Sequence, residues 1–262
     1  MFLNIGDAIN GIAEKYCIVP TNQGVVCNLS PGASILDAAK LESSITNACV
    51  SLGVKSVLTD TLPKDLVVPN QLWSYIHRGN RDGIIKAIDA SSRKKIYEKK
   101  MSPFNDVSDE IKLNLYGYIT CEENGPISDM SKQALRSFPI FQNYSNDQSQ
   151  TKNIVALNTN QNWFILKSYT KRDELLMTSD FISHSKENQA ELKLLISLGI
   201  QQLSHVDFFH DFVIPRLPIL DEKTRIDGVG NMLEHLPSLC DSNPKFFTFL
   251  MEAKIIPSAV SS

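Results

Sequence analysis

"DAAKLESSITNACVSLG" (residues 37–53) and "NQAELKLLISLG" (residues 188–199) are two stretches that end in the same tripeptide and predict the same local structure. Apolar residues recur in both at the spacing of a helix face, at Leu41, Ile45, Ala48 and Leu52 and at Leu192, Leu195 and Ile196. The final glycine of each stretch, Gly53 or Gly199, can adopt the positive φ that ends a helix. We therefore expect two helices, each followed at once by a turn.

Other parts of the chain also match in pairs. The serines before the shared leucines lie 197 − 51 = 146 residues apart, and the same offset aligns "KDLVVPNQLW" (64–73) with "HDFVIPRLPI" (210–219). "RDGIIKAI" (81–88) matches "IDGVGNML" (226–233), and "PTNQGVVCNLS" (20–30) matches "NTNQNWFILKS" (158–168). Four matches in one order indicate a duplicated unit of roughly 140 residues. The final "AKIIPSAVSS" (253–262) resembles "KYCIVPTNQG" (15–24), as if a third copy began there and the chain were a piece of a longer repetitive polypeptide.

The expected fold is mixed α/β and helix-rich, with two tandem repeat units that each place a β-hairpin before packed helices. Gly24 in "PTNQG" suits the turn of the first hairpin, and we expect the second around residues 158–162. Ser204 is a plausible N-cap for a helix in which Val206, Phe209 and Val213 face one way until Pro215 interrupts it. Further helices are expected over residues 80–90, 108–119, 226–236 and 243–253.

The boundary between the repeats is expected at Gly125-Pro126, inside "CEENGPISDMSK" (121–132). This boundary gives a first unit over residues 1–125, whose start is missing, and a second over residues 126–262, which ends at the start of a third motif. The polar stretch "NYSNDQSQTKN" (143–153) is expected to be an exposed loop within the second unit.

The composition is that of an ordinary globular protein, with 42% hydrophobic and 21% charged residues and a net charge of −3. It provides no basic surface for nucleic acid, and the densest basic run, "SRKKIYEKK" (92–100), is typical of a solvated helix face. No apolar run reaches the roughly 20 residues of a membrane span, and the N-terminus lacks a basic signal-peptide region. The five cysteines share no CxxC spacing, so we expect reduced thiols and a cytoplasmic location, with the nucleus as the alternative.

A family resemblance covers nearly the whole chain. "ALRSFPIFQNYS" (134–145), "LISLGIQQLSHVDFFHDFVIPRL" (195–217) and "MLEHLPSLCDSNPKFFTFLMEAKIIPS" (232–258) resemble blocks of the sacsin repeat region in the family's order, with plant sacsin-like proteins closest in look. The first half fits through "IVPTNQGVV" (18–26) and "LWSYIHRGNRDGIIKAID" (72–89). Phe138 departs from the family's usual leucine, and "IIPSAVSS" lacks the glycine that follows the turn.

The resemblance implies a non-catalytic interaction module of a large chaperone or co-chaperone in protein quality control. Its partners would be seventy-kilodalton heat-shock chaperones and unfolded clients, with no cofactor, nucleic acid or membrane. An alternative is a scaffold segment of a RING-type ubiquitin-ligase-like homologue, and an unrecognised enzyme is a third class. The family's nucleotide site needs a D-x-G-x-G loop, whereas "IDGVGN" places Gly228 directly after Asp227.

Site chemistry is sparse in the sequence. "HVDFFHDF" contains His205, Asp207, His210 and Asp211, but helix geometry puts the two histidines roughly 140° apart, so we expect no metal site there. The chain has no G-x-S-x-G elbow, H-E-x-x-H motif or P-loop, so we assign no catalytic, cofactor-binding or metal-binding residue. Trp73 and Trp163 are expected in the core.

Overall fold

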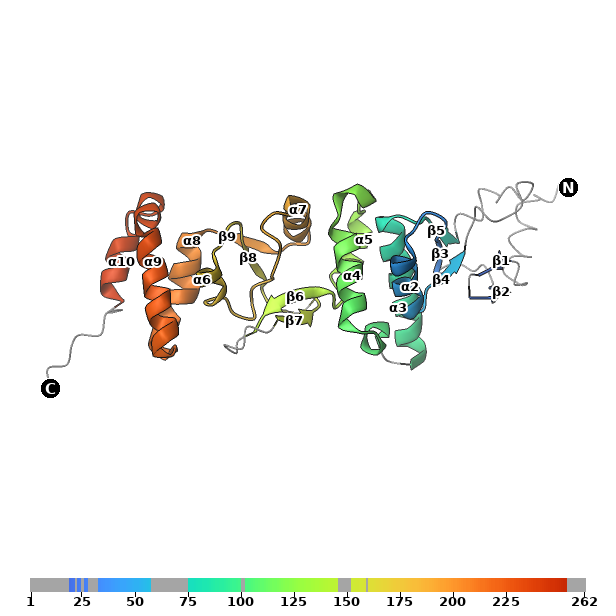
Figure 1. Cartoon of the computed structure of the whole chain (residues 1–262), viewed down its shortest axis with the longest axis horizontal. Coiled ribbons are helices and arrows are strands. Elements are labelled where there is room, and N and C mark those ends of the chain that lie inside the picture. Colours follow the sequence, from blue (N-terminus) through green and yellow to red (C-terminus); the bar gives the residue numbers. More distant parts are fainter. Residues whose placement is uncertain are drawn as a thin grey trace. The chain divides into compact units, whose positions relative to one another are not determined.

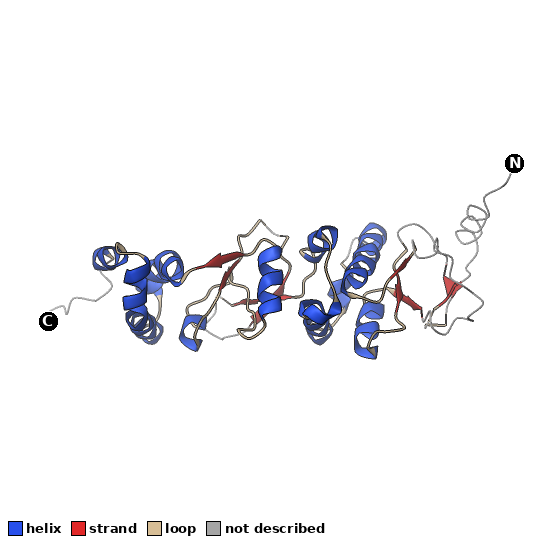
Figure 2. Ribbon diagram, turned by 90° about the horizontal axis from the view of Figure 1, so that it is seen from above, coloured by secondary structure: helices blue, strands red, loops and turns tan. Residues whose placement is uncertain are grey.

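The computed structural model describes residues 19–21, 23–24, 26–27, 33–57, 75–99, 102–145, 152–158 and 160–253 (Figures 1 and 2). The fold is mixed α/β and rich in helix. It contains two compact units: the described residues up to Ile140 with Ala156–Asn158, and Phe141–Val155 with the described residues from 160 onward. Among the described residues, no helix combines the length and apolarity that crossing a bilayer requires.

The first unit begins with the expected hairpin. Strand β1 (Val19–Pro20) pairs antiparallel with β2 (Val26–Cys27). In the turn, the Gly24 N–H donates to the Thr21 carbonyl at 3.0 Å, and Gly24 has a φ of 71°. This confirms the hairpin that the glycine predicts.

A three-stranded parallel sheet follows. Strand β3 (Ile35–Asp37) lies between β4 (Lys55–Val57) and β5 (Ile76–His77). Helix α2 (Ser43–Ser51) connects β3 to β4 and buries Ile45, Ala48 and Cys49. The helices of this unit lie on one side of the sheet in both views (Figures 1 and 2).

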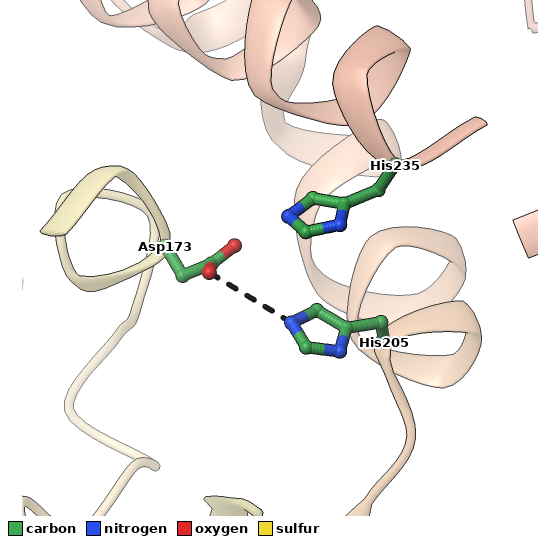
Figure 3. A group of neighbouring side chains, drawn as sticks. All are labelled: Asp173, His205 and His235. Atoms are coloured by element: carbon green, nitrogen blue, oxygen red, sulfur yellow. Dashed lines mark ion pairs between the residues drawn. The ribbon is translucent and has the colours of Figure 1, made fainter. Parts of the chain in front are cut away.

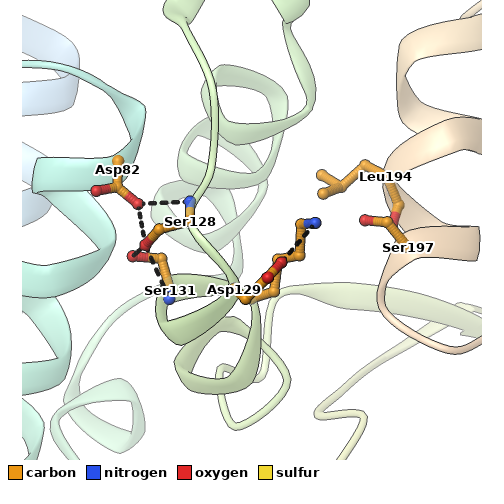
Figure 4. Close-up of polar contacts among 7 residues, drawn as sticks. Asp82, Ser128, Asp129, Ser131, Leu194 and Ser197 are labelled. Atoms are coloured by element: carbon orange, nitrogen blue, oxygen red, sulfur yellow. Dashed lines mark hydrogen bonds and ion pairs between the residues drawn. The ribbon is translucent and has the colours of Figure 1, made fainter.

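The remaining helices of the first unit are joined by polar contacts at the start of α3. These helices are α3 (Arg81–Lys99), a 3-10 turn (Pro103–Asp106), α4 (Asp109–Thr120), a second 3-10 turn (Glu122–Asn124) and α5 (Asp129–Leu135). The Arg81 guanidinium donates to the Ile119 and Cys121 carbonyls at the end of α4, each at 3.0 Å. The Asp82 carboxylate accepts from the backbone N–H and hydroxyl of Ser128, the N-cap of α5 (Figure 4).

These contacts place the end of the first compact unit later than the expected repeat boundary. Gly125 lies inside the unit because α5, which follows it, is bonded to α3 through Asp82 and packs against that helix. A boundary between compact units and one between repeats need not coincide, so the repeat division at 125 stays a prediction.

The described residues of the second unit form two small sheets. Strand β6 (Phe141–Tyr144) pairs antiparallel with β7 (Lys152–Val155), and β8 (Phe164–Leu166) pairs parallel with β9 (Gln201–Leu203). Two helices lie between β8 and β9, α6 (Lys171–Glu174) and α7 (Gln189–Ser197).

The prediction of a hairpin around residues 158–162 is therefore wrong. The strands on its two sides take other partners, because β7 pairs with β6 and β8 pairs with β9. The hairpin of this unit instead uses the ends of the stretch 143–153, so these ends are paired strands and not the exposed loop that the sequence predicts. Asn143 and Tyr144 are buried there, and residues 146–151 lie outside the described ones.

The C-terminal part is helical. It contains α8 (His205–Asp207), a π-helical turn (Phe208–Val213), a 3-10 helix (Ile214–Ile219), α9 (Glu222–Ser242) and α10 (Phe246–Glu252). Ser204 is the N-cap of α8, as the sequence predicts. In the π-helical turn Phe208, Phe209 and Val213 are all buried in the hydrophobic core. A π-helix forms hydrogen bonds between residues i and i+5, and this wider turn brings positions 208 and 213 to the same side.

The two helices that end in a glycine have the same local structure. Each has nine residues, and the glycine that follows has a φ of 86° at Gly53 and 84° at Gly199. After α2 the Val54 N–H donates to the Cys49 carbonyl at 3.0 Å, and after α7 the Ile200 N–H donates to the Leu195 carbonyl at 3.2 Å. Each turn leads directly into a strand that pairs parallel with the strand before the helix. This confirms the predicted helix ends.

Candidate functional site

The four polar residues of "HVDFFHDF" do not converge. Asp207 accepts the Ser204 hydroxyl at 2.6 Å in the capping box of α8, and His210 contacts Asp211 with 2.5 Å between Nδ1 and Oδ1 on the surface. His205 instead faces Asp173, which lies more than thirty positions earlier in the chain.

Within the described residues, one group of histidine, cysteine and acidic side chains is close enough together to hold a metal ion. Its members are Asp173, His205 and His235, and their ligand atoms lie within 4.8 Å of one another. They come from α6, α8 and α9, all in the second unit. Figure 3 shows both imidazoles directing a ring nitrogen toward the Asp173 carboxylate.

Asp173 is fixed by a capping box at the start of α6. Its Oδ2 accepts from the Thr170 backbone N–H at 2.6 Å and from the Thr170 hydroxyl at 2.9 Å. Its Oδ1 accepts from the Asn231 amide of α9 at 2.7 Å. The carboxylate is fully buried, which by itself raises its pKa, but the contacts from His205, Thr170 and Asn231 outweigh burial and lower the pKa to about 2. Asp173 is therefore an ionised group held in one orientation.

His205 is the first residue of α8, where the Ser204 capping box orients the chain. Its Nε2 lies 3.8 Å from Asp173 Oδ2, which is an ion-pair distance but too long for a hydrogen bond. That nitrogen is buried and has no hydrogen-bond partner. A buried polar atom without a partner is costly, so this nitrogen marks a place where a ligand or proton would be stabilising.

His235 completes the cluster from the middle of α9. Its ring stacks on that of His205, with the ring centroids 5.0 Å apart and the planes 25° from parallel. Phe209 of the π-helical turn contacts both imidazoles. An exposed ion pair between Arg172 and Glu234, the neighbours of Asp173 and His235, joins α6 to α9 beside the cluster.

The arrangement suits two kinds of chemistry. One is coordination of a cation by two neutral imidazoles and a carboxylate, and the other is a proton held between His205 and Asp173. Sequence reasoning missed the cluster because its members are 32 and 30 residues apart and lie on three elements whose packing no local pattern specifies. The one available signal was His205 directly after a capping serine.

The other residues that the sequence analysis considered as site or core residues belong to the core or to helices wherever the structure describes them. Trp163 is buried, which confirms its place in the core, and Trp73 lies outside the described residues. Asp227 and Gly228 lie within α9, so "IDGVGN" is helical. Cys49, Cys121 and Cys240 are free thiols, and burial raises the pKa of Cys49 to about 12.

No family model, curated protein or solved structure matches this chain.

Proposed function

We propose that this chain is a non-catalytic interaction module of a large sacsin-like chaperone or co-chaperone, which holds unfolded clients during protein quality control in the cytosol. The proposal draws on the sequence blocks that resemble the sacsin repeat region and on the surface of the C-terminal helices. Seventy-kilodalton heat-shock chaperones are the partner proteins that the resemblance implies.

The observation that carries the proposal is an exposed apolar row on α9. Ile226 and Leu233 are 62% and 52% exposed, and they lie on one helix face because seven residues make nearly two full turns. Gly230 and Pro237 occupy the same face, so the row from position 226 to position 237 carries no charge. Exposed apolar surface of this kind is typical of sites that bind other polypeptides.

Helix α10 adds a second apolar pair in the same unit. Phe247 and Met251 lie one turn apart and are 50% and 68% exposed. Methionine and phenylalanine adapt to varied apolar partners, because a thioether chain is flexible and an aromatic ring offers a large contact area. We infer that the occupant is an apolar segment of an unfolded chain rather than a folded domain of fixed shape.

The repeat organisation is part of the proposal. The β3–α2–β4 and β8–α7–β9 segments share parallel pairing, helix length and the glycine turn. This likeness supports two sacsin-like repeat units, over residues 1–125 and 126–262. The sister of the Pro-terminated segment 210–215, at residues 64–69, lies outside the described residues, so the likeness rests on the β–α–β part.

Suppression of client aggregation tests the function. A thermally unfolded model client is mixed with the whole chain, and light scattering is followed with and without ATP. We expect suppression that does not depend on ATP and that is lost in the double variant Ile226→Asp/Leu233→Asp. The matched control is Ile96→Asp/Met130→Asp, which adds the same charge at exposed apolar positions of the first unit. Equal loss in both double variants, or no suppression by the unaltered chain, would contradict the proposal.

A further inference from the structure

We propose that Asp173, His205 and His235 form a binding site for a divalent metal ion, and that this ion is zinc. The site is independent of the client-binding surface, and neither proposal requires the other. Its three donors lie within 4.8 Å of one another in the second unit (Figure 3).

The donor set matches the chemistry of zinc. Histidine nitrogen and carboxylate oxygen are common zinc ligands, and three protein ligands leave a fourth position for water or a substrate atom. Two neutral imidazoles and one carboxylate also leave one positive charge on a bound divalent ion. The ion would therefore neutralise Asp173, which has no other charged partner at hydrogen-bond distance among the described residues.

A count of lone pairs identifies the oxygen that would bind. Oδ2 already accepts two hydrogen bonds from Thr170, which occupy both of its lone pairs. Oδ1 accepts one, from Asn231, and keeps one lone pair for a metal. The His205 Nε2 lies 3.8 Å from Oδ2, so binding through Oδ1 requires the His205 ring to shift toward that oxygen. Thr170 and Asn231 thus act as outer partners that orient the carboxylate, as such groups commonly do around metal ligands.

The nitrogens require only a local adjustment. Ligand bonds of about 2.0–2.1 Å at tetrahedral angles put donor atoms about 3.4 Å apart, compared with the limit of 4.8 Å that the three donors satisfy here. His205 and His235 are both partly exposed, so each ring can tilt without disturbing the core. Coordination would give the buried Nε2 of His205 the partner that it lacks.

The backbone around the site is already held together. The ion pair between Arg172 and Glu234 fixes the neighbours of two of the ligands, and the Asn231 amide crosses from α9 to α6. A bound ion would add a link to α8 through His205. Because its ligands come from three elements, the ion should stabilise the second unit against unfolding.

The competing explanation is that the cluster holds a proton and no metal. His205 would then form an ion pair with Asp173 when protonated, and His235 would only stack on it. Titration of the whole, untagged, chelator-treated chain with zinc chloride, followed by calorimetry and by thermal unfolding, separates the two. We expect saturation at about one ion per chain and a higher unfolding temperature with zinc.

The variants His205→Gln and His235→Gln test the assignment, since Asp173→Asn would also break the cap of α6. We expect each to weaken zinc binding by about tenfold or more while circular dichroism stays unchanged. The control is His210→Gln, which removes an exposed histidine five positions from His205 and should leave binding intact. Cobalt substitution should give the visible bands of a nitrogen and oxygen site, without thiolate charge transfer.

The proposal would be overturned by the absence of stoichiometric binding to the unaltered chain, by equal weakening in His210→Gln, or by a cobalt spectrum that shows cysteine ligation. Unchanged affinity in His235→Gln together with loss in His205→Gln would also overturn it, because the site would then not be the three-residue cluster.

Discussion

Replacement of Asp82 by alanine is expected to destabilise the first unit by about 2–3 kcal/mol at neutral pH. The Asp82 carboxylate accepts from the Ser128 backbone N–H at 2.8 Å and from the Ser128 hydroxyl at 2.7 Å (Figure 4). It also forms an ion pair with Lys86 at 2.6 Å. Hydrogen bonds to a charged group contribute about 1.5–3 kcal/mol each when well buried, and less here because the Asp82 side chain is 22% exposed. The ion pair with Lys86 is partly exposed and adds only about 0.3–0.5 kcal/mol.

The effect of the Asp82 variant should depend on pH. Burial raises the pKa of the Asp82 carboxyl, but hydrogen bonds from Lys86, Ser128 and Ser131 outweigh burial and hold that pKa well below its usual range. The unfolded chain therefore takes up the proton first, and the stabilisation is complete above about pH 4 and declines as the pH falls further. The difference between the unaltered chain and the variant should shrink in the same window.

Urea unfolding followed by circular dichroism measures the effect of this change. The control is Asp129→Ala, which removes a 94% exposed carboxylate one residue after Ser128 and should cost less than about 0.5 kcal/mol. A loss below about 1 kcal/mol in Asp82→Ala, or an equal loss in the control, would refute the reasoning that Asp82 joins α3 to α5.

Three other predictions follow from particular residues. Gly53→Ala and Gly199→Ala should each lower the free energy of unfolding, measured by heat or urea, by about 1 kcal/mol, because both glycines have positive φ. The control Gly117→Ala, inside α4, should be neutral or stabilising. Unchanged stability in either of the first two variants would contradict the turn assignment. Burial lowers the pKa of His184, so the unfolded chain binds a proton at this residue more tightly, and stability should decline as the pH falls below about 6.5. The difference between the urea midpoints at pH 7.5 and pH 5.5 should be smaller in His184→Gln than in the unaltered chain. An unchanged difference would exclude this residue as the cause. Labelled ATP with magnesium should neither bind nor be hydrolysed, and micromolar binding abolished by Asp227→Ala would show that a nucleotide site had been missed.

Local signals in this sequence were sufficient for local structure. Gly53 and Gly199 ended their helices as predicted, and Ser204 capped α8, because each of these features depends on a few neighbouring residues. The first hairpin followed for the same reason, since Gly24 supplies the positive φ that its turn needs. Apolar spacing also located the long helices of both units.

Features that depend on distant partners could not be predicted in this way. The turn around residues 158–162 looked like a hairpin, but β7 pairs with β6 and β8 pairs with β9 across a longer stretch of chain. The π-helical turn that buries both Phe208 and Phe209 breaks the regular spacing on which the sequence argument relied. His235 gave no signal at all, because only the packing of α9 against α6 and α8 brings it to Asp173 and His205.

Site-specific crosslinking is the most direct test of the interaction module. A photoreactive residue is placed at position 226, 233 or 247, or at the control position 96, and the whole chain is illuminated with an unfolded client. The account predicts crosslinks to the client from the three positions on α9 and α10 and none above background from position 96. Equal crosslinking at position 96, or no crosslinks from α9 and α10, would contradict it.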